Sequence, residues 1–179
     1  MNQHELDTTI ASAQAGKEES YRRLFSEYSQ TVFRLVSRFI ANTEEAEELT
    51  QDTFLQAFGA LADFRRERAP FSNWLRRIAY NLCVDRLRRT YPQFVSLEDT
   101  MDADNISDTQ DSTGENSEES IQALMLAISQ LPEEEQTILQ LYYFEGLSLQ
   151  DIAYVVESNS RALANRLARI RNKLRKKLS

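Results

Sequence analysis

LSLQDIAYVVESNSRALANRLARIRNKLRKKL, residues 147–178, is the stretch that decides the fold of the C-terminal part of the chain. Ser148 can cap a short helix, because Asp151 follows it by three residues in an arrangement close to a capping box. After the polar residues 157–160, Ser160 can cap a second helix. The apolar residues of that helix recur at steps of three or four and share one face: Leu163, Leu167, Ile170, Leu174 and Leu178.

The second of these helices is basic. From Ser158 to the C-terminus there are eight Lys or Arg residues and no acidic residue. Two short helices, a tight turn and a basic second helix are typical of a helix-turn-helix that enters the DNA major groove. The alternative is a solvated polar face on a terminal helix. We predict DNA contacts at the outward and flanking positions Arg161, Ala164, Asn165, Arg166, Arg169 and Lys173.

The charge of the chain is unevenly distributed. The net charge of −7 is unusual for a nucleic-acid-binding protein, but residues 98–119 hold nine acidic residues and no basic ones. Without this stretch, 19 acidic residues remain against 21 basic ones, a balance of about +2. Residues 93–120 are rich in Asp, Ser, Thr, Asn and Glu and carry few apolar side chains, so we predict a flexible acidic linker there.

The rest of the chain shows helical periodicity and no strand pattern of useful length. We expect one or two helices over residues 5–41 with a break near Gly16, and a further helix from Asn42 or Thr43. Another helix is expected from Trp74 to Arg89, capped by Ser72 or Asn73, with Leu75, Ile78, Ala79 and Leu82 inward and the arginines facing elsewhere. Periodicity resumes at Ile121, and Pro132 opens a helix that ends at Gly146. These patterns predict an all-α fold of two small helical domains, 5–92 and 121–179, joined by the linker 93–120.

A second basic cluster lies in residues 65–89, which hold eight arginines against Glu67 and Asp85. Aromatic residues are interleaved with these arginines: Phe64, Phe71, Trp74 and Tyr80. Arginines neutralise phosphates, and aromatic rings can stack on the bases of a single strand. A solvated basic face above core aromatics is the alternative interpretation.

The helix that starts near Asn42 is acidic. Its predicted core side carries Leu49, Thr53 and Ala57, and off that side we place Glu47, Glu48, Gln51, Asp52, Phe54, Leu55 and Phe58. An acidic helix repels phosphate, so a positively charged protein partner would account for it. An ordinary solvated face, with acids placed favourably for the helix dipole, explains the same residues.

No catalytic constellation is visible in the sequence. His4 lies in an N-terminus that we expect to be frayed, and Cys83 falls among apolar helical positions. Zinc spacing, a glycine-rich phosphate loop and a Ser/His/Asp arrangement are absent, so we expect no metal, no cofactor and no enzyme activity. One cysteine suggests a reducing compartment, and no signal peptide or long apolar run is seen. We therefore expect a cytoplasmic protein without membrane insertion.

Four segments, in this order, resemble the extracytoplasmic-function class of bacterial RNA polymerase sigma factors. The segments are AEELTQDTFLQAF (46–58), FSNWLRRIAYNLCVDRLRR (71–89), LPEEEQTILQLYYFEGLSLQDIA (131–153) and ANRLARIRNKLRKKL (164–178). They are similar to region 2.2, to regions 2.3 and 2.4, to the start of region 4 and to its recognition helix. The resemblance covers roughly residues 20–90 and 121–178, most of the chain outside the acidic stretch.

The resemblance implies partners and roles for the candidate residues. Core polymerase (β′ clamp and β flap), promoter DNA and an anti-sigma factor are the implied partners. Contact with the β′ clamp is implied for Glu47, Glu48, Gln51, Asp52, Phe54, Leu55 and Phe58. Contact with the −10 element is implied for Phe64, Phe71, Ser72, Trp74, Arg76, Arg77, Asn81 and Arg88, with loop 64–73 beside an extruded base. The basic helix would read the −35 element, and the acidic linker would lie near the active-site channel and the RNA exit path.

One short step departs from the family pattern. Family members usually carry a Gly-Thr-Val-like step, then a basic residue and Ser, where this chain has residues 161–165, RALAN. The hydroxyl expected at Ala162 and the base expected at Ala164 are absent, and Arg161 replaces a permissive glycine. The pattern therefore predicts how the helix binds but not which −35 sequence it prefers.

Two other function classes compete with a sigma subunit. A sigma mimic would resemble sigma and sequester an anti-sigma factor without using DNA; the altered step at 161–165 favours it, and the retained arginines count against it. A stand-alone helix-turn-helix regulator would explain residues 147–178 but would leave the helices of residues 42–89 without a role.

Overall fold

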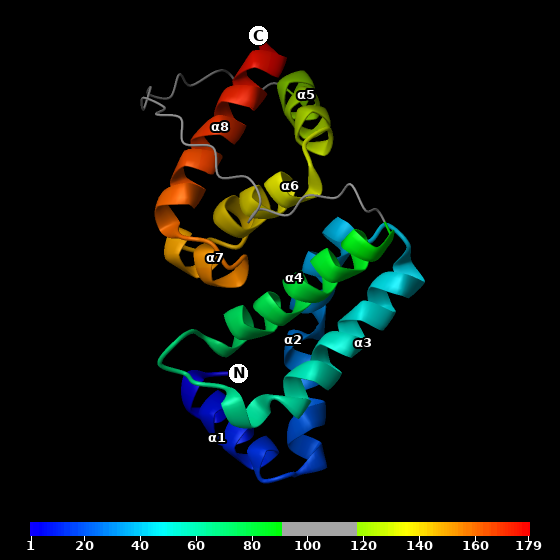
Figure 1. Ribbon diagram of the computed structural model, residues 1–179, viewed down its shortest axis with the longest axis vertical. Coiled ribbons are helices and arrows are strands. Elements are labelled where there is room, and N and C mark those ends of the chain that lie inside the picture. Colours follow the sequence, from blue (N-terminus) through cyan, green and yellow to red (C-terminus); the bar gives the residue numbers. More distant parts are fainter. Residues whose placement is uncertain (91–117) are drawn as a thin grey trace. The chain divides into compact units, whose positions relative to one another are not determined.

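The computed structural model describes residues 1–90 and 118–179. The chain forms two compact units, residues 1–94 and 95–179, and every regular element in the described ranges is helical (Figure 1). The predicted all-α fold with two helical domains is confirmed. The predicted linker 93–120 lies outside the described residues except for its last three, which already belong to a helix.

The N-terminal unit contains four α-helices and one 3-10 turn. They are α1 (Gln3–Gln14), α2 (Glu18–Phe39), α3 (Thr43–Gly59), η1 (Leu61–Asp63) and α4 (Phe71–Thr90). Gly16 has a φ of 83° and separates α1 from α2, as its lack of a Cβ allows. The expected frayed N-terminus is wrong, because Asn2 and Glu5 form a capping box at the start of α1. Asn42 caps α3 by accepting a hydrogen bond from the amide of Glu45.

Helices α2, α3 and α4 pack against one another and enclose the core of this unit (Figure 1). Leu24 and Leu75 are fully buried, and so is Leu61 of η1 at 2% exposure. Val32, Leu35, Val36 and Phe39 of α2 are also buried, whereas Phe25 is 39% exposed. Helix α1 packs against α2 and buries Leu6, Ile10 and Ala13 there.

Helix α4 presents a different face to the core from the one predicted. It begins at Phe71, before the expected cap at Ser72 or Asn73. Ile78 and Leu82 are half-buried, whereas Arg76 is only 8% exposed. The prediction that Arg76 faces away from the core is therefore wrong. The long aliphatic stem of an arginine can be buried while its guanidinium finds polar partners, and here the guanidinium donates to Asn73 Oδ1 at 3.0 Å.

Cys83 lies inside the N-terminal core and has no disulfide partner. Burial raises the pKa of its thiol to about 12. A thiol that stays protonated at neutral pH is a poor nucleophile. Cys83 therefore packs in the core as a small apolar side chain.

The C-terminal unit contains α5 (Glu118–Ser129), α6 (Glu133–Leu139), η3 (Gln140–Phe144), α7 (Leu149–Val155) and α8 (Ser160–Leu178). α5 starts three residues before the predicted boundary at Ile121, so Glu118 and Glu119 form its first turn and not the end of a linker. η3 is a short π-helical turn, and Gly146, with a φ of 66°, follows it where the helix was predicted to end.

Helices α7 and α8 form the predicted helix-turn-helix (Figure 1). Ser148 caps α7 by accepting a hydrogen bond from the amide of Asp151, as predicted. Asn159, not Ser160, caps α8 through the amide of Ala162. Between the helices Glu157 takes a left-handed φ of 55°, a conformation that glycine adopts most easily.

The apolar stripe of α8 is buried over its N-terminal half. Leu163, Leu167 and Ile170 are at most 2% exposed. Leu174 is half-buried, and Leu178 is 45% exposed near the end of the helix. The stripe fixes which side of α8 faces the core and which side faces outward.

Candidate functional surfaces

Helix α3 presents an outward stripe of acidic and apolar residues. Glu48, Asp52 and Leu55 follow at steps of four and three, which places them on one face. Leu55 is 70% exposed, and Glu48 is also exposed. An exposed leucine beside carboxylates is typical of a surface that a partner covers. This stripe contains three of the seven residues predicted for contact with polymerase.

Two of the remaining residues turn toward α2. Phe54 is 2% exposed and packs on the ring of Phe25 at 4.8 Å, so the prediction that it lies off the core side of α3 is wrong. Phe58 is half-buried and packs on Tyr21 at 4.7 Å. Aromatic pairs at these distances stabilise the α2–α3 interface, and Phe54 therefore positions the outward stripe.

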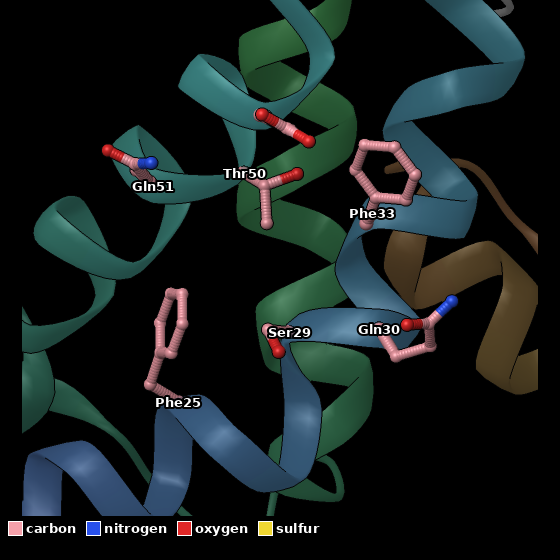
Figure 2. A pocket seen from close by; sticks show the side chains of 7 residues that line it. Phe25, Ser29, Gln30, Phe33, Thr50 and Gln51 are labelled. Carbon is pink, nitrogen blue, oxygen red and sulfur yellow. The ribbon is translucent and has the colours of Figure 1, made fainter. Parts of the chain in front are cut away.

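A groove of about 310 Å³ lies between α2 and α3. Figure 2 shows Thr50 and Gln51 of α3 on one wall and Phe25, Ser29 and Phe33 of α2 on the other. Glu47, one of the predicted residues, also lines it.

The α2 residues of this groove were missed in the sequence. Phe25, Ser29 and Phe33 follow at steps of four, on a column beside the core stripe of α2. The signal was Phe33, an aromatic residue outside the core periodicity.

Helix α4 carries an outward column of polar and aromatic residues. Trp74, Arg77, Asn81 and Arg88 lie at i, i+3, i+7 and i+14, which is a single face. Asn81 and Arg88 are exposed, and Trp74 and Arg77 are half-buried. Four of the eight residues predicted for the −10 element thus share one surface, which we call the α4 column.

The other predicted −10 residues lie beside or beneath this column. Phe64 and Phe71 are 8% and 1% exposed. Their rings stack with Trp74 at 5.1 and 5.7 Å. Phe71 and Phe64 therefore pack beneath the tryptophan, and they are buried in the free chain, as is Arg76. Ser72 is half-buried at the start of the helix.

Helix α8 exposes its predicted DNA-reading side at the N-terminal end. Arg161, Ala164 and Asn165 are exposed, and Arg169 is half-buried one turn further along. Arg161, Asn165 and Arg169 are separated by steps of four, opposite the buried leucines. We call these three residues the α8 column.

Lys173 is the next residue of this column, four positions after Arg169, but its side chain is engaged within the unit. Its ammonium donates to Glu135 Oε1 of α6 at 2.6 Å, and the Glu135 side chain is 7% exposed. A buried carboxylate needs a charged partner, so Lys173 holds α8 against α6. The prediction that Lys173 contacts DNA competes with this role. Arg166 is half-buried on the same side of the helix.

Arg171 makes a second tether from α8. Its Nε donates to the Tyr143 hydroxyl at 2.8 Å, and its guanidinium carbon lies 5.8 Å from the centre of that ring. The hydrogen bond raises the pKa of Arg171, which stays charged. Two basic residues of α8, Lys173 and Arg171, therefore hold the helix against the rest of its unit.

Within residues 1–90 and 118–179, no three His, Cys, Asp or Glu side chains are grouped so that they could hold a metal ion. No helix in these ranges is long and apolar enough to cross a membrane.

Comparison with known proteins accounts for both units. The family model of sigma-70 region 2 matches residues 24–91, and that of sigma-70 region 4 matches residues 121–174. The RNA polymerase sigma-H factor of Pseudomonas aeruginosa is 31% identical, over 99% of this chain and 96% of the relative. The chain belongs to the extracytoplasmic-function family of RNA polymerase sigma factors. The resemblance drawn from the sequence is thereby confirmed.

Further comparisons agree with this family. The sigma factor SigW of Bacillus subtilis is 28% identical over 94% of this sigma factor and 94% of its own length. The fold is similar to that of the sigma factor RpoE of Bartonella quintana, solved in complex with the anti-sigma factor NepR. That structure has a TM-score of 0.62 and 19% identity, and the match covers 89% of this chain and 97% of that one. The family consists of transcription initiation factors.

Proposed function

We propose that this sigma factor binds core polymerase through α3 and contacts both promoter elements, through α4 and α8. Domain 5–92 then serves polymerase and the −10 element, and domain 121–179 serves the β flap and the −35 element. One observation carries the proposal: most of the predicted contacts that are not buried fall on one outward face of each helix. The polymerase performs the chemistry in the cytoplasm, and this chain supplies recognition.

The charge and the exposed leucine of the α3 stripe support its assignment to the β′ clamp. Exposed Glu48 and half-buried Asp52 precede Leu55 on the same face, which suits a basic partner with an apolar contact. The adjacent groove combines the aromatic rings of Phe25 and Phe33 with the carboxylate of Glu47. A guanidinium group can stack on such rings and pair with a carboxylate, so we infer that a partner arginine enters this groove.

The α4 column suits the −10 element as it melts. Trp74 can stack on an exposed base, and Asn81 can donate and accept hydrogen bonds at a base edge. Arg77 and Arg88 on the same face would neutralise the strand's phosphates. Flipping a base costs a few kcal/mol, which stacking and hydrogen bonds offset.

The α8 column suits the −35 element in duplex form. Arg161 and Asn165 lie near the start of a helix whose N-terminal residues reach base edges when it enters the major groove. Arg169 lies one turn further along, and a bidentate contact with a guanine is the role that we propose for it.

Arg169→Ala is expected to weaken −35 discrimination by about 1–3 kcal/mol, because one arginine contact to a base edge contributes that much. The measurement is binding of the purified holoenzyme to fragments that differ only in the −35 element. Lys176→Ala is the matched control, since an outward lysine near the end of α8 should weaken all fragments alike. Equal weakening on every fragment by Arg169→Ala would make Arg169 a phosphate contact.

An anti-sigma factor is a further proposed partner. The similar fold of RpoE was solved with its anti-sigma factor, which supports such a partner for this chain. The acidic residues 98–119 would lie near the polymerase active-site channel and the RNA exit path, where their charge mimics nucleic acid.

Transcription from a promoter library tests the proposed function. Purified chain is added to core polymerase and a library of promoter fragments, and initiated transcripts are sequenced. Transcripts that share −35 and −10 sequences are the expected result. If no fragment is transcribed and a small anti-sigma domain binds tightly, the chain is a sigma mimic. DNA binding that does not require polymerase would identify a stand-alone regulator.

A further inference from the structure

Helix α1 lies outside the sigma-70 region 2 match, which begins at residue 24, yet it contacts the loop that joins α3 to α4. That loop runs from Leu61 to Arg68 and carries Phe64, which packs on Trp74 of the α4 column. The position of the loop therefore affects the surface proposed for the −10 element. The inference below rests on that assignment.

Two polar contacts connect α1 to the loop. Gln14 Nε2 donates to the carbonyl oxygen of Leu61 at 3.0 Å, and the Arg66 guanidinium pairs with the Asp7 carboxylate. Both contacts join segments about fifty residues apart in sequence, so neither is a product of local loop geometry. They fix the loop at its first residue and near its tip.

The Asp7 carboxylate is itself held in place. Gln3 Nε2, one helical turn earlier, donates to Asp7 Oδ1 at 2.9 Å, while Arg66 takes Oδ2. α1 is secured on α2 by the burial of Leu6 and Ile10. A carboxylate oriented by a neighbouring amide on a packed helix is a fixed anchor for a loop arginine.

The loop does not depend on close apolar packing against α1. A groove of about 280 Å³ lies between them, lined on one side by Ile10, Ala11 and Gln14 and on the other by residues 64–67. Arg65, Arg66, Glu67 and Arg68 are all exposed. The loop tip is therefore restrained by individual polar contacts, which single substitutions can remove.

We propose that α1 is a brace that sets the position of loop 61–68 for −10 recognition, with Asp7 and Gln14 as positioning residues. In this role α1 orients the exposed arginines of the loop and keeps Phe64 packed against Trp74. α1 does not itself contact DNA. Its loss should allow the loop several positions, so that preferred and unpreferred −10 sequences bind more nearly alike. The pair between Asp7 and Arg66 also keeps that arginine in one orientation.

The test uses holoenzyme reconstituted with the full chain, a fixed −35 element and a randomised −10 element. Asp7→Ala is expected to lower the ratio of the binding affinities for preferred and unpreferred −10 sequences about threefold. This is the size of effect expected for one exposed ion pair. Core-polymerase affinity and −35 discrimination should not change. The charge-swapped double variant Asp7→Arg with Arg66→Asp should restore the ratio toward wild type, which a loss of helix stability alone would not allow.

Two controls separate the possible failures. Glu18→Ala removes an exposed ion pair with Arg22 on α2 that does not touch the loop, and should leave the −10 ratio unchanged. Asn81→Ala tests the α4 column directly: an unchanged ratio there means that the −10 assignment itself has failed. If Asn81→Ala changes the ratio and Asp7→Ala does not, the brace is wrong. A rise in affinity for all DNA fragments on Asp7→Ala, with the −10 ratio unchanged, also overturns the proposal. Asp7 would then only neutralise the charge of Arg66.

Discussion

Phe71→Ala is expected to lower the free energy of unfolding of the N-terminal unit by about 3–5 kcal/mol, the usual cost of truncating a buried phenylalanine. Phe71 is 1% exposed, and its ring lies 5.3 Å from both Tyr28 and Phe64. Removal of the ring leaves a cavity that these neighbours cannot fill without moving from their own contacts. Trp74, the single tryptophan of the chain, lies 5.7 Å away and reports the transition by fluorescence.

The measurement is chemical denaturation of wild type and variant, followed by tryptophan fluorescence and circular dichroism. Phe71→Leu should cost less, because leucine fills part of the volume. Leu55→Ala, at a residue 70% exposed, should stay within about 0.5 kcal/mol of wild type. An unchanged unfolding free energy for Phe71→Ala, together with weaker binding to −10 DNA, would instead make Phe71 the direct contact that the sequence predicted.

Local signals in the sequence were sufficient to predict the helix-turn-helix. Ser148 was identified as a cap because its hydroxyl acts on an amide three residues away. The cap of α8 was misplaced by one residue, since Asn159 and Ser160 both have capping side chains. The buried stripe through Leu163 and Leu167 followed from the helical period alone.

The errors occurred where a helix touches two partners. α3 packs against both α2 and α4, so it buries a wider arc than one stripe, and Phe54 is covered by Phe25. Arg76 was assigned outward because arginine is charged, although its stem lies in the core and its guanidinium reaches Asn73. Periodicity locates the centre of the buried face, but the partners determine its width.

Contacts distant in sequence were not predictable from any local pattern. The pair of Lys173 with Glu135 joins residues 38 apart and ties a predicted DNA contact to a carboxylate of its own unit. The groove between α2 and α3 likewise requires both helices in place. The outward columns of α4 and α8 were largely anticipated, because a face opposite a predicted core follows from the same helical geometry.

Leu55→Asp is expected to weaken binding of the chain to core polymerase by about 2–4 kcal/mol, roughly 30- to 1000-fold in Kd. An interface that covers Leu55 would bury the new carboxylate without a partner, which costs more than the lost apolar contact. The side chain is 70% exposed, and its helix neighbours Glu48 and Asp52 already carry negative charge. The fold should be unaffected, because the substitution adds a polar group where water already reaches.

Gln56→Asp is the matched control for Leu55→Asp. It places the same charge on the same exposed helix about 100° around from Leu55, next to Asp52 at the edge of the α3 stripe and away from its apolar end. Binding is measured by fluorescence anisotropy of labelled chain titrated with core polymerase, and thermal unfolding of each variant is recorded beside it. A large loss for Leu55→Asp with little change for Gln56→Asp would identify the stripe as the contact. Equal losses of affinity in the two variants would mean that the added negative charge alone causes the effect. If neither variant changes the affinity, the polymerase contact does not lie on this face of α3.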